Sequence, residues 1–353
     1  MKDRRIPQNR SWACGLLTIV ALIVLGPLSA QGEITKITQI IDSTGAGFPH
    51  FLGSPRGIAV DGSGNVYVTA GAGHFEDVFK IRYGVITSII DGAGDGTNPL
   101  AGLGGIAVSI YSGNVYVTGA GSDNAFKIAM PSGAITQIID STGDGTNPLS
   151  GPTGIAVDSS GNVYVAGGSS HNAFKITGAT ITQIIDSTGD GTNPLSFPTG
   201  IAVDPDGIVY VAGGSSSNAF KITGGTITQI IDSAGDGTHP LNFPTGIAVS
   251  QLGNVYVAGG ISNNAFKIAM PSGAITQIIN SAGDGTHPLS DPSAIASDVS
   301  GSGVYVAGFT SQNAFKIASG VNENVPTLSN IGGITLALML LMGGAFAVRR
   351  KMR

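Results

Sequence analysis

The stretch "PTGIAVDSSGNVYVAGGSSHNAFKITGATITQIID", residues 152–186, contains four short runs rich in Val, Ile, Tyr and Phe. Gly, Ser, Asn and Thr separate the runs. β-branched and aromatic residues favour strands, and turn residues of this kind bound them. The stretch therefore predicts four short strands joined by tight connections.

The same pattern occurs six times along the 353 residues, with spacings of 48, 49, 46, 46 and 48 residues between copies. The copies are aligned on "GIAV" and begin at Gly57, Gly105, Gly154, Gly200, Gly246 and Ala294. Four strands in roughly 40 to 50 residues are typical of one blade of a β-propeller. The composition, with 55 Gly and only three Glu, also favours turn-rich β structure over helix. We predict an all-β fold, a six-bladed β-propeller of four-stranded blades over residues 31–320.

The placement of one partial copy distinguishes a ring from a stacked solenoid. The sixth copy has no "ITQIID" run after Ile317, whereas such a run stands at Ile37–Asp42, ahead of the first "GIAV". In a ring, an N-terminal strand can complete the last blade and remove its open edge. We expect Ile37–Asp42 to close the ring in this way.

Two aromatic positions recur in every copy. The first is a Tyr in the second run, at Tyr67, Tyr116, Tyr164, Tyr210, Tyr256 and Tyr305, and the second is a Phe in the third run, at Phe79, Phe126, Phe174, Phe220, Phe266 and Phe315. Equal aromatics at equal register indicate packing of blade against blade. A ring of aromatics that stacks on carbohydrate is the alternative.

The pattern "PTGIAVDSSGNVYVA…NAFKI" resembles that of the NHL-repeat propellers, and the resemblance extends over residues 34–317. It implies the propeller fold. It leaves the function open, because that family includes lyases, lactonase-like enzymes, sensor domains and binding scaffolds.

The first 30 residues have the pattern of a secretory signal peptide. Four basic residues precede the apolar run "GLLTIVALIVLG", and the small-residue exit "PLSAQG" places the cleavage site after Ala30. The one cysteine, Cys14, lies within this segment, so the expected mature chain has no thiol chemistry.

The C-terminus carries a second apolar run. Ile331–Val348 has 18 residues, which is long enough for a transmembrane helix, and the basic tail 349–353 is expected on the cytoplasmic side. The linker 321–330 contains Val325, Pro326, Thr327 and Leu328. This motif, followed by one helix and a basic tail, resembles the IPTL-type sorting signals of Gram-negative bacteria.

The sorting resemblance implies a membrane-embedded, exosortase-like processing protease as a partner. The Trp-Gly that usually continues the motif is missing here, so a plain tail anchor is the alternative. We expect an exported protein of the cell envelope. It is either anchored through its C-terminal helix or found at the surface after processing.

The expected exported body is acidic. Residues 31–324 contain 9 Lys and Arg against 21 Asp and Glu, a net charge of −12 (9 minus 21). Nucleic-acid binding needs clustered basic side chains that neutralise phosphates. The charge therefore excludes nucleic acid as a partner.

The links between copies contain "DSTGDGTNPLS", at 140–150 and again at 186–196. Asp140 and Asp144, and likewise Asp186 and Asp190, partly match the start of a calcium loop. An EF-hand is excluded because position twelve of the first loop is Gly151, where a bidentate Glu is required. We interpret the loop as a turn stiffened by Pro and hydrogen-bonded by Asp144, with weak calcium binding as the alternative.

Three histidines, His50, His239 and His287, fall in the links that enter the first, fifth and sixth copies. Copies 5, 6 and 1 are neighbours in a ring, so these side chains are candidate zinc ligands on one face. The simpler interpretation is that His239 and His287 replace Asn147 and Asn193 in a polar loop. No Ser-His-Asp arrangement and no phosphate-binding Gly loop stands out.

Two functions remain open from the sequence. The favoured one is a non-enzymatic binding scaffold that needs no cofactor and whose polar loop face binds a glycan, a peptide or a matrix polymer. The alternative is a metal-dependent lyase or a lactonase-like hydrolase that uses the three histidines.

Overall fold

The computed structural model describes residues 40–41, 45–47, 49–50, 54–72, 75–298 and 303–318. The described residues belong to one compact unit, Ile40–Arg353, and form 23 strands. None of the described residues forms a helix that is long and apolar enough to cross a membrane. The expected signal peptide, sorting motif, C-terminal helix and basic tail lie outside the described residues.

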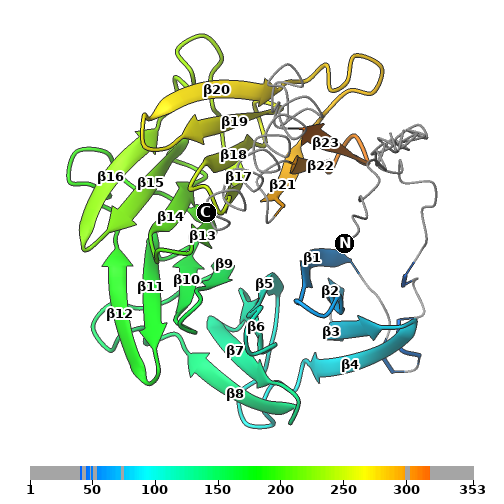
Figure 1. Cartoon of the computed structure of the whole chain (residues 1–353). Coiled ribbons are helices and arrows are strands. Elements are labelled where there is room, and N and C mark those ends of the chain that lie inside the picture. Colours follow the sequence, from blue (N-terminus) through cyan, green and yellow to red (C-terminus); the bar gives the residue numbers. More distant parts are fainter. Residues whose placement is uncertain are drawn as a thin grey trace, which may run out of the picture. The chain divides into compact units, whose positions relative to one another are not determined.

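The strands form six separate sheets, each built from consecutive antiparallel strands (Figure 1). Blade 1 contains β1 (Pro55–Val60), β2 (Val66–Ala72), β3 (Phe75–Arg82) and β4 (Val85–Asp91). Blade 2 contains β5 (Leu103–Val108), β6 (Val115–Gly119), β7 (Asn124–Ala129) and β8 (Ala134–Ile139). Blade 3 contains β9 (Pro152–Val157), β10 (Val163–Gly167), β11 (Asn172–Thr177) and β12 (Thr180–Ile185).

The remaining blades follow the same order. Blade 4 contains β13 (Pro198–Val203), β14 (Val209–Gly213), β15 (Asn218–Thr223) and β16 (Thr226–Ile231). Blade 5 contains β17 (Pro244–Val249), β18 (Val255–Gly259), β19 (Asn264–Ala269) and β20 (Ala274–Ile279). Blade 6 has three described strands, β21 (Pro292–Ser297), β22 (Gly303–Gly308) and β23 (Asn313–Ala318). The predicted six-bladed propeller is thus confirmed, with four strands in each of blades 1 to 5.

The "GIAV" strands are the innermost strands, and those of blades 1 to 5 each contact the innermost strand of the next blade. Their small residues allow this approach. A Cβ atom on Gly154 would lie 3.1 Å from the backbone nitrogen of Ile201 and 3.2 Å from the Cα of Gly200. A methyl group here would crowd the neighbouring blade by a few tenths of an ångström, which accounts for the Gly at this position in blades 1 to 5; blade 6 has Ala294.

The core lies between blades, as the two aromatic positions predict. In one cluster Tyr164 of blade 3 packs with Val209, Val211 and Phe220 of blade 4. Equivalent clusters join blades 1 and 2, 2 and 3, 4 and 5, and 5 and 6. Burial of the apolar side chains thus stabilises neighbouring blades together rather than each sheet alone.

The sixth blade differs from the others at its exposed side. Tyr305 of β22 is 40% exposed, whereas the equivalent Tyr164 is 1% exposed. On the blade 1 side, Ile58 is 66% exposed, against 7% for the equivalent Ile155. Of the expected closing strand Ile37–Asp42, only residues 40 and 41 are described, and neither is assigned to a strand. Closure of the ring by this segment stays a prediction.

Candidate functional site

Each end of the propeller carries its own set of connections, because the strands of a blade alternate in direction. The links from one blade to the next share one end with the loops between the second and third strands, and we call this end the loop face. The turns between the first and second strands lie at the opposite end, the turn face. Each face has a cavity, and the residues that line the two cavities are described below.

The links on the loop face are organised by an aspartate. Oδ1 of Asp144 accepts hydrogen bonds from the backbone N–H groups of Thr146 (3.0 Å) and Asn147 (2.8 Å). Its Oδ2 accepts from Asn147 Nδ2 (3.0 Å) and from the backbone N–H of Gln183 in the next blade (3.3 Å). The hydrogen bonds from Asn147 lower the pKa of Asp144 to about 2. Asp190 repeats these contacts one blade later.

The outer acid of each link is also engaged locally. Oδ1 of Asp140 accepts hydrogen bonds from the backbone N–H (2.9 Å) and the hydroxyl of Thr142, and Asp186 does the same with Thr188. In the part of the chain that the structure describes, no three His, Cys, Asp or Glu side chains group closely enough to hold a metal ion. Weak calcium binding at these links stays a prediction. The geometry itself is that of the Asx-type turn expected from the sequence.

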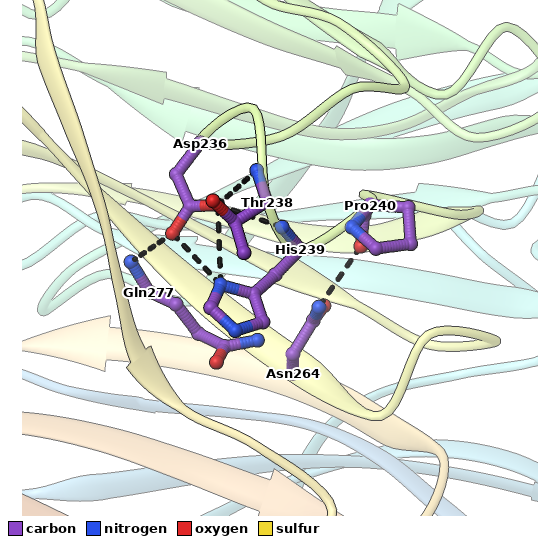
Figure 2. Close-up of polar contacts among 6 residues, drawn as sticks. All are labelled: Asp236, Thr238, His239, Pro240, Asn264 and Gln277. Atoms are coloured by element: carbon purple, nitrogen blue, oxygen red, sulfur yellow. Dashed lines mark hydrogen bonds and ion pairs between the residues drawn. The ribbon is translucent and has the colours of Figure 1, made fainter.

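The three candidate zinc ligands each contact a carboxylate. Nδ1 of His50 lies 2.8 Å from Oδ1 of Asp77. Nδ1 of His239 lies 3.0 Å from Oδ2 of Asp236, the residue three positions before it, as Figure 2 shows. His287 repeats that contact with Asp284 at 3.0 Å.

His239 and His287 therefore replace Asn147 in its structural role. The ring nitrogen of each takes the position of the asparagine Nδ2 beside the loop carboxylate, and the backbone N–H contact is retained. The described residues do not bring His50, His239 and His287 into one group of three.

A second network on the loop face could not be read from the repeat. Each of blades 2 to 5 has one residue with positive φ in the loop between its second and third strands. The side chain of this residue accepts a hydrogen bond from a backbone N–H of the following link, at the residue just before the first strand of the next blade. The pairs are Asp123 with Gly151 (2.7 Å), His171 with Phe197 (2.8 Å), Ser217 with Phe243 (3.2 Å) and Asn263 with Asp291 (2.7 Å). The contact is the same in all four blades, but the side chain that accepts the hydrogen bond is a different residue type in each.

The first strands of blades 3, 4 and 5 add contacts between neighbouring blades on this face. The hydroxyls of Thr153, Thr199 and Thr245 donate to the carbonyl oxygens of Pro198, Pro244 and Pro292 in the following blades. The cavity here has a volume of about 650 Å³ and is lined from blades 6, 1, 2 and 3. Its lining includes Arg56, Gly104, Thr153, Ser293 and Phe309.

The turn face has a cavity of about 510 Å³ rimmed by carboxylates that support the turns. Oδ1 of Asp158 accepts from the N–H groups of Ser160 and Asn162, while Oδ2 accepts from the hydroxyl of Tyr164 (2.9 Å). Burial raises the pKa of Asp158, but the hydrogen bonds from Asn162 and Tyr164 outweigh it, so that the pKa is lowered.

The same Asp–Tyr bond occurs in blades 1 and 4, between Asp61 and Tyr67 and between Asp204 and Tyr210. In blade 5 a serine, Ser250, replaces the aspartate, and the buried hydroxyl of Tyr256 has no hydrogen-bond partner among the described residues. Ser250 is close enough to affect the pKa of Tyr256, which burial raises, but its hydroxyl does not meet hydrogen-bond geometry.

Comparison with known proteins supports the fold. Residues 135–175 match a family model described as a beta-propeller repeat, SBBP. The match begins in the outer strand of blade 2 and ends within β11, the third strand of blade 3. A propeller repeat is therefore confirmed, while the NHL assignment stays a prediction. No curated protein matches this sequence.

Several solved structures share the architecture. Virginiamycin B lyase from Staphylococcus aureus is 19% identical, with a TM-score of 0.53 over 76% of this chain and 85% of that chain. A gluconolactonase from Xanthomonas campestris is 16% identical, with a TM-score of 0.53 over 76% and 86%. An auxiliary nutrient binding protein from Bacteroides thetaiotaomicron is 13% identical, with a TM-score of 0.54 over 76% and 69%. At these identities the similarity shows the fold alone.

Proposed function

We propose that this chain is an exported envelope propeller whose loop face binds a partner without transforming it. The observation that carries the proposal is the state of its polar side chains. Asp140 and Asp144 are hydrogen-bonded within the link that enters blade 3, and His239 contacts Asp236 within the link that enters blade 5, whereas His50 contacts Asp77 of β3. Such hydrogen bonds hold the loop surface in shape, as a preorganised binding face requires.

The direction of the pKa shifts agrees with a binding role. Each resolved shift among the described carboxyl groups is downward, as for Asp144 and Asp190. Burial raises the pKa of the resolved tyrosines, as it does for Tyr164. A general acid or base near neutral pH requires shifts in the opposite direction.

The partner that we propose is a glycan, a peptide or a matrix polymer of the envelope. Export through residues 1–30 gives access to it. Retention by Ile331–Val348, or release after processing near Val325–Leu328 by a membrane protease, fixes where the propeller acts. The acidic body, with a net charge of −12 over residues 31–324, supports the exclusion of nucleic acid.

Metal analysis separates this proposal from the alternative, a metal-dependent lyase or lactonase-like hydrolase. We expect the purified full chain to carry no stoichiometric zinc, and alanine at His50, His239 and His287 to leave its metal content unchanged. Ser217→Ala on the same face is the matched control. Stoichiometric zinc that is lost in the histidine variants would favour the enzyme instead.

A further inference from the structure

The blades differ in chemistry around the cavity on the loop face, which we call the mouth. The second residue of the first strand is the Thr that bonds the next blade in blades 3, 4 and 5. At this position blade 1 has Arg56, blade 2 has Gly104 and blade 6 has Ser293. A second position, just after the second strand, is Ala or Gly in blades 2 to 5 but Phe309 in blade 6. All four replacements line the same cavity of about 650 Å³.

Arg56 provides the cation of this cavity. It is exposed, and none of the described residues forms an ion pair or a hydrogen bond with its guanidinium. Two acids of the loop face, one in β3 of blade 1 and one in the link that enters blade 6, have other partners. Glu76 accepts a hydrogen bond from the N–H of Leu103 (3.1 Å), and Asp291 accepts one from the hydroxyl of Thr310 (3.3 Å). The guanidinium is therefore available to a ligand carboxylate, which it matches with two parallel donors.

The acidic body limits how much negative charge the ligand can carry. One arginine at a mouth within a domain of net charge −12 attracts a single carboxylate, whereas a polyanion would be repelled by the rest of the surface. The charge pattern therefore selects a ligand with one carboxylate that enters the mouth by that end.

The replacements at Gly104 and Phe309 indicate which groups the rest of the ligand should carry. Gly104 has no hydroxyl, so the carbonyl oxygen of Pro152 lacks the threonine donor that Pro198, Pro244 and Pro292 have. Gly104 and Pro152 both line the cavity, so a ligand hydroxyl can donate to this carbonyl oxygen. Phe309 is 71% exposed and offers an apolar ring face. A pyranose ring has hydroxyl donors and an apolar C–H face that packs on an aromatic ring.

We propose that this mouth binds the terminal uronic acid residue of a short oligosaccharide. The carboxylate pairs with Arg56, a ring hydroxyl donates to the carbonyl oxygen of Pro152, and the sugar face packs on Phe309. The cavity volume lies within the range of small-molecule sites. This inference rests on the proposed binding function and names the ligand of the loop face.

Calorimetry tests the proposal on the full chain, purified in a mild detergent. The two probes are a disaccharide with a terminal glucuronate and the same disaccharide with a neutral terminal glucose. We expect the acidic probe to bind more tightly, with an affinity that falls as salt is added.

The repeat itself supplies substitutions that the fold accepts. Arg56→Thr installs the residue of blades 3 to 5, and Phe309→Gly installs that of blades 3 to 5 at the second position. Arg56→Thr should weaken the acidic probe by about tenfold to a hundredfold and leave the neutral probe unchanged, because it removes a charge-assisted pair. Phe309→Gly should weaken both probes. Lys127→Thr removes one positive charge on β7 and should change neither affinity.

Three other results would each reject a specific part of the proposal. Equal binding of the two probes, or an acidic probe insensitive to Arg56→Thr, would reject the uronate assignment and leave a binding function in place. Failure of both sugars, together with binding of a peptide through its C-terminal carboxylate at Arg56, would reject the glycan. Cleavage of either disaccharide, detected by mass spectrometry, would instead reject the proposed non-enzymatic function.

Discussion

Replacement of one repeated tyrosine by phenylalanine should have opposite effects in two blades. Tyr164 and Tyr256 occupy the same position in blades 3 and 5, and each is 1% exposed. The hydroxyl of Tyr164 donates to Asp158, whereas that of Tyr256 has no partner among the described residues. We predict that Tyr164→Phe destabilises the propeller and that Tyr256→Phe stabilises it.

The magnitudes follow from the two environments. Tyr164→Phe loses a hydrogen bond to a charged acceptor, which contributes about 1.5 to 3 kcal/mol. Tyr256→Phe removes a buried, unsatisfied hydroxyl that costs about 1 to 3 kcal/mol, so the variant should gain about 1 kcal/mol or more. Ring burial is equal at the two sites and cancels in the comparison. The free energies of unfolding of the two variants should thus differ by roughly 3 kcal/mol.

Urea unfolding at pH 7, followed by circular dichroism, measures both variants against the parent chain. An unchanged m-value with a shifted midpoint would attribute the difference to stability. Ser250→Asp provides the matched test, because it restores the acceptor in blade 5 and should make Tyr256→Phe destabilising in that background. Equal destabilisation by the two single variants would refute the reasoning.

Four further predictions concern other parts of the chain. Gly143→Ala should destabilise more than Gly145→Ala: both glycines have positive φ, but a Cβ at Gly143 would collide with a loop carbonyl oxygen, whereas one at Gly145 meets nothing within 4 Å. Equal midpoints in urea would contradict this. The stabilising contribution of Asp144 is complete above its usual pKa of 3.8 and is lost as the pH falls toward about 2, so Asp144→Asn should flatten an acid titration of stability in that window. Deletion of residues 31–43 should expose the edge of blade 6 and cause aggregation on size-exclusion chromatography, and a soluble truncation of equal stability would argue against ring closure. Mass spectrometry of the C-terminus from a native host should find processing near Val325–Leu328, and an intact tail ending at Arg353 would leave a plain anchor.

The architecture could be predicted from the sequence because each blade repeats its turn residues and its two aromatic positions, which are buried in blades 1 to 5. The exposed side of blade 6 could not be predicted in the same way. Tyr305 belongs to the aromatic set, yet its exposed fraction depends on what lies beyond the last blade, and the repeat pattern contains no information on that neighbour.

Candidate site residues were predicted less completely, for a physical reason. The role of Asp144 follows from local spacing, since its partners lie within three residues and in the adjoining strand. The histidine hypothesis assumed that side chains from different blades converge. The simpler interpretation, that His239 takes the place of an asparagine of the loop, needed only the alignment of the copies, and the contact of His239 with Asp236 agrees with it. The contact of Asp123 with Gly151 joins residues 28 positions apart and changes its chemistry in each blade, so no motif marks it.

The six copies also act as internal controls for function. Where the scaffold fixes a residue, the copies agree, as at Phe174 and its equivalents in the core. Where the copies disagree without a change in backbone path, the scaffold tolerates several residues, and selection for something other than folding can decide among them. Arg56 and Phe309 are such positions, because the Thr and Gly of other blades fold at the same places. Both line one cavity although they belong to opposite ends of the repeat array, at blades 1 and 6. A cation and an aromatic ring at one mouth are the two groups that the carboxylate and the apolar face of an acidic sugar would contact, so a ligand of this kind accounts for both departures from the repeat.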